Sequence, residues 1–451
     1  MERNYKFIFI AMWLAISAHA GPLPELKLAD TDRILVLAPH PDDEVLGCGG
    51  IIQEAVARKL PLRVVFLTHG DENQWSFFLY RMHPVIWPSS VRALGEVRVK
   101  EALMAARVFG LSWEHLQFLG YPDFGTLAIW NQHWGDQPAY KSLLTRSVAV
   151  PYSDALRPGA PHRGEEILRD LTQVLEEFRP TKVFVSHPAD HNGDHRALYL
   201  FTRVALWDVE KEIQPTLHPY LIHYRRWPQP RSYEADAPLN PPATLDGEAA
   251  WHVFPLTPAQ VATKHRALQE HVTQYKSNGR YLRTFIRTNE LFGDWPVAHL
   301  TGSTNSLHSL ELLEQKGPAE QLTEAERAQF TGVEWDHARL VGDNLELSLR
   351  LSRPLAREVQ ASIYAFGYRR DTPFAQMPKL HIKLGELRTQ IFDQNRRLDD
   401  NMLRVTRSEN EIIVSIPRAV LGKPDRILTG ARTYVVEVPL DWVAWRVLRL
   451  D

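Results

Sequence analysis

The sequence has one cysteine, almost no net charge and no long apolar run, and each scarcity excludes a class of protein. Cys48 is the only cysteine among 451 residues, so the chain cannot form an internal disulfide. Lysine and arginine total 52 against 54 acidic residues, giving a formal charge of −2. No basic stripe or long run of one sign is present, which argues against a nucleic-acid partner. Internal repeats and low-complexity tracts are absent as well.

Residues 1–20 have the pattern of a secretory signal peptide. MERNYK carries positive charge, FIFIAMWLAIS is a short apolar run, and Ala18-His19-Ala20 has the small-x-small form of a cleavage site. The apolar run is shorter than the ~20 residues that a membrane span needs, although an uncleaved anchor stays an alternative. We therefore expect an exported protein, periplasmic or extracellular, with no stable membrane span after cleavage.

Apolar runs and amphipathic stretches alternate from residue 21 to residue 295. The expected strands are Ile34–Leu37, Leu62–Thr68, His115–Gly120, Thr181–Ser186 and Pro219–Tyr224, and the expected helices are Val45–Arg58, Val91–Phe109 and Gly164–Phe178. This alternation predicts an α/β domain with a Rossmann-like, mostly parallel sheet and helices on both faces. Two insertions, residues 71–90 and 121–163, are long enough to favour walls of a substrate cleft, with an oligomer contact as the alternative.

The last part of the chain has a different pattern, of short alternating strands separated by turns. It predicts an all-β, sandwich-like domain over residues 326–451, joined by a linker over 296–325. Clustered histidines and acids lie only before Gly293, so we expect the first domain to carry out the chemistry by itself. The final segment VPLDWVAWRVLRL is similar in pattern to accessory carbohydrate-binding domains, although an aromatic core would have the same pattern.

Histidines and carboxylates gather directly after two of the predicted strands. The stretch ILVLAPHPDDE (Ile34–Glu44) contains His40, Asp42, Asp43 and Glu44, and the stretch HPADHNGDHRA (His187–Ala197) contains His187, Asp190, His191, Asp194 and His195. Such groups are costly to bury together unless a cation compensates their charge. The carboxyl ends of parallel strands share one edge of a sheet, where ligands collect. The two clusters therefore predict a joint metal site.

Both clusters resemble signatures of the PIG-L or LmbE-like deacetylases. APHPDDE (Ala38–Glu44) is similar to the first signature and HPADHNGDHRA to the second. Other pieces agree in the same order, namely THGDE, RVKEALMAARVFG, FLGYPDFG and KHRALQEHVTQY, so the similarity covers about residues 30–295. The resemblance implies a zinc-dependent N-deacetylase with His40, Asp43 and His195 as ligands. Water would complete the tetrahedron, and the metal would acidify it.

The same resemblance implies roles for neighbouring residues. Asp42 would be the general base, within reach of the water. Glu44 opens a helix, where its charge suits the helix dipole, so we expect a capping and supporting role. Asp190 is expected to orient a histidine of the site. Arg98 and Asp123 match family positions near the substrate cleft, although Arg98 could instead pair with Glu101 on its own helix.

Asn192 departs from the family pattern, because many members carry there a histidine that protonates the leaving amine. The general acid is then open between His187, His191 and Asp42 itself, and we favour Asp42 assisted by His187. An alternative role for the Asn192 amide is substrate binding.

These observations together predict an exported, zinc-dependent enzyme that removes an N-acetyl group from an amino sugar or glycan. The substrate class comes from the resemblance. Two alternatives stay open: an amidase or esterase acting on another acylated small molecule, and a glycan-binding envelope protein with little or no turnover. The sequence does not predict an oligomeric state.

Overall fold

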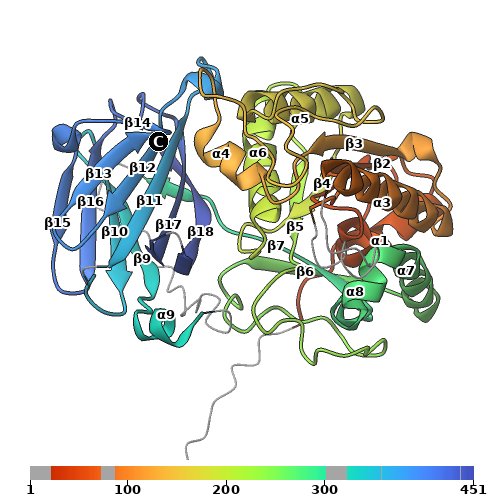
Figure 1. Cartoon of the computed structure of the whole chain (residues 1–451). Helices are drawn as coiled ribbons and strands as arrows, with labels where there is room; N and C mark the ends of the chain where they lie inside the picture. The colour runs from red at the N-terminus through yellow and green to blue at the C-terminus, as the bar shows by residue number, and fades with distance from the viewer. Residues whose placement is uncertain (1–21, 73–86, 301–321, 357, 437, 451) are drawn as a thin grey trace, which may run out of the picture.

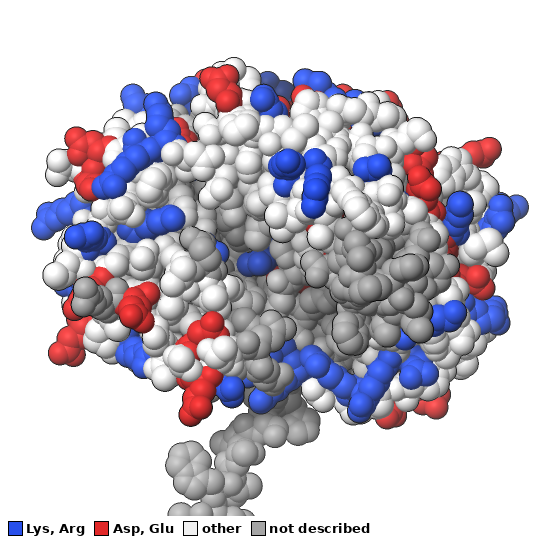
Figure 2. Space-filling view, in the orientation of Figure 1, with Lys and Arg blue, Asp and Glu red and all other residues white. Residues whose placement is uncertain are grey.

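The computed structural model describes residues 22–72, 87–300, 322–356, 358–436 and 438–450. The predicted signal peptide and most of the first insertion lie outside these ranges. Figure 1 shows an α/β unit lying beside a β unit made from the C-terminal part of the chain. On the face shown in Figure 2, acidic and basic side chains are both spread over the two units. No helix among the described residues is both long and apolar enough to cross a bilayer.

The α/β unit is built on one sheet with the strand order β3-β2-β1-β4-β5-β7-β6. Its strands are β1 (Ile34–Ala38), β2 (Leu62–Thr68), β3 (Leu116–Tyr121), β4 (Lys182–Ser186), β5 (Thr216–Tyr220), β6 (Ala250–Pro255) and β7 (Asn289–Asp294). Its helices are α1 (Asp43–Ala57), α3 (Pro88–Val108), α4 (Thr126–Gln132), α5 (Gly164–Phe178), α6 (Gly193–Asp208), α7 (Pro258–Glu270) and α8 (Val272–Leu282). Strands β1 to β5 pair in parallel, whereas β7 is antiparallel to β5 and β6. The predicted mostly parallel sheet is confirmed.

Helices cover both faces of this sheet because β1 is apolar on both. Val36 packs in one apolar cluster with residues of α1 and α3, whereas Leu35 and Leu37 pack in a second cluster with residues of α5 and α6. The chain moves from β1 outward to β2 and β3, then returns to form β4 on the other side of β1. Such a reversal opens a crevice between the carboxyl ends of the two central strands, which is where ligands bind in open α/β sheets.

Glycines near the start of α1 let this helix lie close to its neighbours. A Cβ atom at Gly47 would lie 2.4 Å from the ring of Tyr220, and one at Gly50 would lie 2.1 Å from Leu256. The Tyr220 hydroxyl in turn donates a hydrogen bond to the Leu37 carbonyl at 2.9 Å. The close approach therefore holds the N-terminal half of α1 against the ends of β1 and β5.

The β unit contains two sheets, as a sandwich requires. One has the order β15-β16-β10-β9 and the other β14-β13-β12-β11-β17-β18-β8. The elements are β8 (Ala298–Leu300), α9 (Glu324–Ala328), β9 (Val333–Val341), β10 (Asn344–Leu351), β11 (Val359–Tyr368), β12 (Lys379–Leu384), β13 (Thr389–Asp393), β14 (Arg396–Arg397), β15 (Arg404–Arg407), β16 (Glu411–Pro417), β17 (Arg426–Val435) and β18 (Val438–Leu450). Most of the predicted linker over 296–325 lies outside the described residues, but strand β8 at its start pairs in parallel with β18 and so belongs to the larger sheet.

The larger sheet of the sandwich is buried on both faces. Along β11, Ile363 faces the core between the two sheets, whereas Tyr364 and Phe366 belong to the cluster that also contains residues of α5 and α6. Trp130 of α4 lies between the units, with ring centroids 5.7 Å from Phe366 and 6.2 Å from Trp445. The two units therefore share one apolar core. This contact argues against the expectation that the first domain works by itself, because truncation at residue 326 would expose that core.

We expect Trp130→Ala to lower the free energy of unfolding by about 3–5 kcal/mol, the usual range for removing a large buried aromatic ring. Trp130 is fully buried, whereas Trp87 is 63% exposed, so Trp87→Ala serves as the control and should change stability by less than about 0.5 kcal/mol. Urea unfolding followed by circular dichroism measures both. Equal stability of the two variants would show that the units do not share a core.

Candidate functional site

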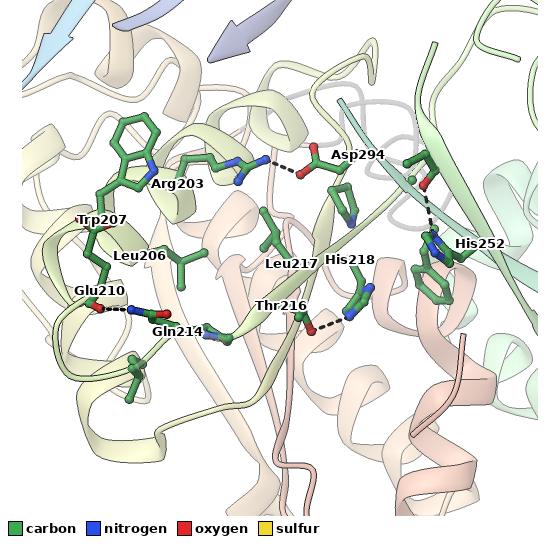
Figure 3. A pocket seen from close by; sticks show the side chains of 16 residues that line it. Arg203, Leu206, Trp207, Glu210, Gln214, Thr216, Leu217, His218, His252 and Asp294 are labelled. Carbon is green, nitrogen blue, oxygen red and sulfur yellow. Dashed lines mark hydrogen bonds and ion pairs between the residues drawn. The ribbon is translucent and has the colours of Figure 1, made fainter. Parts of the chain in front are cut away.

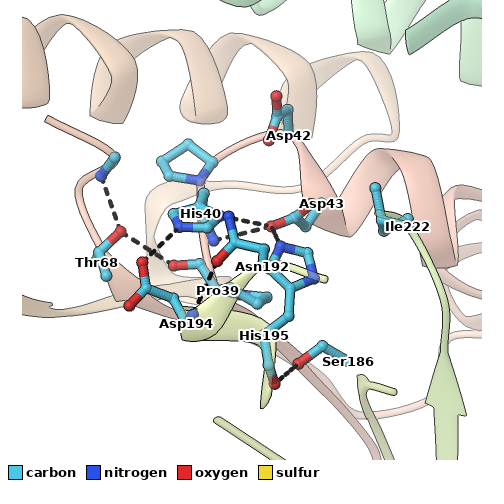
Figure 4. Close-up of polar contacts among 12 residues, drawn as sticks. Pro39, His40, Asp42, Asp43, Thr68, Ser186, Asn192, Asp194, His195 and Ile222 are labelled. Carbon is cyan, nitrogen blue, oxygen red and sulfur yellow. Dashed lines mark hydrogen bonds and ion pairs between the residues drawn. The ribbon is translucent and has the colours of Figure 1, made fainter. Parts of the chain in front are cut away.

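The turn between β1 and α1 carries the first cluster into the crevice. The strand ends at Ala38 and the helix begins at Asp43. Between them Asp42 has a φ angle of 124°, which is rare for a residue with a side chain and costs of order 1–3 kcal/mol. Its backbone N–H donates to Glu44 Oε2 at 2.8 Å. Figure 4 shows the result: the Asp43 carboxylate points between the rings of His40 and His195, and Asp42 lies apart from them.

The structure brings together the three residues predicted as metal ligands. Asp43 Oδ2 lies 3.1 Å from His40 Nδ1 and 3.1 Å from His195 Nε2, and all three side chains are buried. One ligand atom from each residue lies within 4.8 Å of the others. His40 comes from the end of β1, whereas His195 lies in the first turn of α6, after β4. The crevice between β1 and β4 therefore assembles the trio.

Asp190 holds His195 in place, as predicted. Its Oδ2 atom lies 3.0 Å from His195 Nδ1 and accepts the backbone N–H groups of Ile222 and His223 at 3.1 and 2.9 Å. The Asn192 N–H donates to its Oδ1 at 2.9 Å. Burial opposes ionisation of Asp190, but the neighbouring His195 and, to a lesser extent, the Asn192 N–H stabilise the charged carboxylate and lower its pKa to about 2.

Asp194 ties the second insertion to His40. Its Oδ2 atom lies 3.2 Å from His40 Nε2 and accepts the Phe124 N–H at 2.6 Å. Its Oδ1 atom accepts both the N–H and the hydroxyl of Thr126, at 3.1 and 2.5 Å. Asp123, in the same segment, has its Oδ1 atom 3.0 Å from His40 Nε2. Part of this insertion therefore forms a wall of the site, as expected for a substrate cleft.

The donor set of the trio fits a divalent cation. Within the described residues, neither ring nitrogen of His195 has an aligned hydrogen-bond partner, although both are buried. Burial opposes protonation of His195, but the Asp190 and Asp43 carboxylates outweigh it and raise its pKa to about 9. The negative charge of the carboxylates around the two imidazoles is thus larger than the positive charge that the imidazoles can carry. A bound cation would neutralise the excess. His40 also forms a cluster with Asp123 and Asp194, but Asp194 already accepts three hydrogen bonds.

Arg98 supports the turn that carries Asp42. Its guanidinium donates to the Gly70 and Pro41 carbonyls at 2.7 and 2.5 Å, and its Nη2 atom lies 3.5 Å from Asp42 Oδ1. Burial raises the pKa of Asp42 to about 7, even though the Arg98 charge acts in the opposite direction. The alternative pairing of Arg98 with Glu101 is wrong, because Glu101 accepts instead from the N–H and hydroxyl of Thr273.

The structure places His187 in other surroundings than predicted. The His187 ring packs against Trp251 and Trp295, with centroids 5.4 and 5.3 Å away, and does not line the cavity beside the trio. Burial lowers its pKa to about 3, so it is neutral. We therefore correct its assignment as a catalytic group. Asn192 does border the cavity, and its side chain caps α6 by accepting the Asp194 N–H at 2.8 Å.

Two further histidines of the site were missed. His223 follows β5, and its ring centroid lies 4.8 Å from that of His195. His271 Nε2 lies 2.9 Å from Glu44 Oε1, so Glu44 joins α1 to the segment between α7 and α8 as well as capping the turn. A signal for His223 was available, because β5 is parallel to β4 and its carboxyl end reaches the same edge. His271 offered no comparable signal, since it comes from a distant helical segment.

The trio opens on a cavity of about 100 Å³. It is lined by His40, Asp42, Asp43, Leu46, Arg98, Asp123, Phe124, Asn192, His223, Gln274, Asn278 and Leu282. A larger cavity of about 650 Å³ lies elsewhere, between α6 and strands β5, β6 and β7. Figure 3 shows Arg203 paired with Asp294 beside it. Its lining includes none of the predicted site residues, so the smaller cavity is the candidate active site.

Comparison with known proteins identifies relatives of the α/β unit. Residues 35–206 match the PIG-L family, described as GlcNAc-PI de-N-acetylase. A 1D-myo-inositol 2-acetamido-2-deoxy-alpha-D-glucopyranoside deacetylase of Mycobacterium sp. (strain KMS) is 27% identical over 185 residues, which are 40% of this chain and 53% of that protein. The match thus spans about half the length of that relative. A Streptomyces avermitilis protein of the same name is 25% identical over 57% of this chain and 87% of its own.

Among solved structures, the N,N'-diacetylchitobiose deacetylase from Pyrococcus horikoshii is similar to this chain. The two are 19% identical, and the alignment covers 58% of this chain and 83% of that one with a TM-score of 0.36.

We expect Asp194→Ala to lower the free energy of unfolding by about 3–5 kcal/mol, because it leaves buried donors in the segment 124–126 without their acceptor. Asp194→Asn keeps an acceptor oxygen and should cost less. The exposed Asp136 provides the control, and Asp136→Ala should change stability by less than about 0.5 kcal/mol. Urea unfolding in the presence of zinc is the measurement. Wild-type stability in Asp194→Ala would contradict the role given to this carboxylate.

Proposed function

We propose that the protein is a zinc-dependent hydrolase that removes an N-acetyl group from an amino sugar, since residues 35–206 match the PIG-L family. The observation that carries the proposal is the buried trio of His40, Asp43 and His195, open to a cavity that Asp42 also lines. The named activities of the relatives support an N-acetylated glucosamine unit as the substrate class. The N-terminal pattern supports an exported protein.

Each residue of the cavity has a separate role in the proposed hydrolysis. Zinc held by the trio would supply a Lewis acid that acidifies water and polarises the acetyl carbonyl. Asp42 is the base that takes the proton of the attacking water, since its carboxylate lines the cavity beside the trio without being one of the three ligands. Arg98 fixes the turn on which Asp42 lies, and so positions it.

Asp42 also donates the proton to the leaving amine. His187 does not reach the cavity, and Asn192 cannot donate an acidic proton. His223 is the remaining imidazole beside the trio that is not a proposed ligand. Loss of acetate release in His223→Gln with zinc retained would transfer the acid role from Asp42 to His223.

The assay that tests the proposal measures acetate released from a panel of N-acetyl sugars by the zinc-loaded protein. Acetate from these sugars supports it. Release from other amides or esters alone would favour an amidase or esterase. Binding of the sugars without release would favour a glycan-binding protein.

We expect about one zinc ion per chain, and His40→Ala, Asp43→Ala and His195→Ala should each abolish tight binding. The fold should persist, because the apolar core of the sheet does not depend on the ion. His252→Ala changes a histidine beside the larger cavity of Figure 3 and should retain the metal. Elemental analysis after dialysis, with circular dichroism as the check on folding, is the measurement. Full zinc occupancy in His195→Ala would contradict the assignment of His195 as a zinc ligand.

We expect Asp42→Asn to retain zinc and substrate while lowering turnover by roughly 10²- to 10⁴-fold, the usual contribution of a positioned general base. Asparagine is close to aspartate in size but cannot accept the proton. Asp30→Asn is the matched control, because the Asp30 side chain is 94% exposed on the surface. Steady-state acetate release and calorimetric binding separate the two effects. Near-normal turnover in Asp42→Asn would remove Asp42 from the mechanism.

A further inference from the structure

A second cavity, of about 570 Å³, lies where the sandwich meets the α/β unit. It shares three lining residues with the small cavity beside the trio, namely Phe124, Asn192 and His223. The two cavities therefore adjoin along these side chains. Volumes of 300–1,000 Å³ are typical of sites that enclose most of a small ligand, whereas the smaller cavity has room for little more than an acyl group.

Both units build the walls of this interdomain cavity. Leu127 of α4 and Arg196 of α6 line it from one side, and Tyr364 of β11, Arg432 of β17 and Trp442 of β18 line it from the other. His191 also borders it, with its ring centroid 4.7 Å from that of Trp442. The sandwich therefore contributes directly to the surface that continues from the candidate active site.

The charged side chains that line the cavity are basic. Among the residues that the structure describes, its lining includes Arg196 and Arg432 but no aspartate or glutamate. Each guanidinium lies over an aromatic ring of the sandwich: Arg196 Cζ is 5.3 Å from the Trp442 centroid and Arg432 Cζ is 4.9 Å from that of Tyr434. Within the described ranges, neither arginine has a carboxylate at ion-pair distance.

Polar atoms of the same two arginines also lack partners. In the described part of the chain, Nε of Arg196 and Nε of Arg432 are buried without a hydrogen bond, as is Nε1 of Trp442. The carboxylates that act on Arg196 from a distance are Asp190 and Asp194. Asp190 is already engaged with His195 and three backbone N–H groups, and Asp194 with Phe124 and Thr126. Both side chains are partly buried, and a partly buried guanidinium without a carboxylate partner favours an anion from outside the chain.

We propose that the interdomain cavity binds an anionic group carried by the same glycan whose N-acetyl group reaches the candidate metal centre. The substrate would then be an N-acetylated amino sugar joined to a unit that bears a carboxylate or a phosphate. Arg196 and Arg432 contact the anion, because a guanidinium donates paired hydrogen bonds to either group. This inference rests on the proposed deacetylase function and specifies its substrate.

The experiment compares matched substrates on the zinc-loaded full chain. The probes are N-acetylglucosamine linked to glucuronic acid, the methyl ester of the same disaccharide, and N-acetylglucosamine 1-phosphate. The ester removes the charge and adds one methyl group, and the phosphate distinguishes the two kinds of anion. We expect kcat/KM for the preferred anionic probe to exceed that for the ester by about 10- to 100-fold, since a hydrogen bond to a charged group contributes about 1.5–3 kcal/mol.

Substitution of the sandwich arginine tests its role. Arg432→Gln should raise KM for the preferred anionic probe by about 10-fold or more with little change in kcat, leave the ester within about twofold, and show partial recovery in Arg432→Lys. Arg396→Gln is the control, because the Arg396 side chain is 72% exposed and pairs with Asp393 outside the cavity. Circular dichroism checks that each variant is folded.

The outcomes separate the two proposals. Preference for an anionic probe that Arg432→Gln abolishes supports the inference. Equal hydrolysis of acid, ester and phosphate, with no effect of Arg432→Gln, would overturn it while the deacetylase function stands. No acetate from any probe or simple N-acetyl sugar would overturn the proposed function, and the substrate inference with it.

Discussion

The burial of several carboxylates around two imidazoles is the constraint on which the rest of this site depends. At the ends of β1 and β4, three of these acids have different partners. Asp190 and Asp194 are saturated by backbone N–H and hydroxyl donors, so their charge is already compensated. Asp43 accepts one backbone N–H and otherwise faces only His40 and His195. Its remaining charge is what a cation would neutralise, and the surrounding turns serve to hold that arrangement.

The strained turn at Asp42 follows from the same constraint. Two adjacent aspartates must lie in different surroundings, one beside the imidazoles and one beside Arg98. The left-handed backbone at Asp42 separates them, and the hydrogen bonds of Arg98 to Pro41 and Gly70 stabilise the turn. The sequence pair therefore produces one candidate ligand and one candidate base from neighbouring positions.

The sandwich is part of the same structural unit as the α/β domain. Its larger sheet presents aromatic residues to α4 and α6, so that neither unit buries its apolar surface alone. The same contact leaves an interdomain cavity whose far wall carries Arg432 and Trp442. A domain that looks like an appendage in the sequence thus shapes the space into which a substrate would extend.

Much of the sheet and of the candidate site could be predicted because both depend on local patterns. The strand Leu62–Thr68 and the helix Gly164–Phe178 match β2 and α5 residue for residue, since apolar periodicity directly reports burial. His187 was misjudged for a physical reason: it leaves the end of β4 among charged neighbours, but its ring turns into an aromatic pocket made by Trp251 and Trp295. The orientation of the His187 ring depends on packing against β6 and the segment after β7, which are far along the chain.

The sequence by itself determined the α/β class, the sandwich-like second part, and the two motifs that meet where the strand order reverses. These follow from short-range periodicity and from the rule that parallel strands end at one edge. Only the tertiary structure decided that His223 and His271 join the site, that Arg98 supports the turn of Asp42, and that two arginines face an interdomain cavity. Each of these depends on segments distant in the chain meeting in space, which no local pattern of residues encodes.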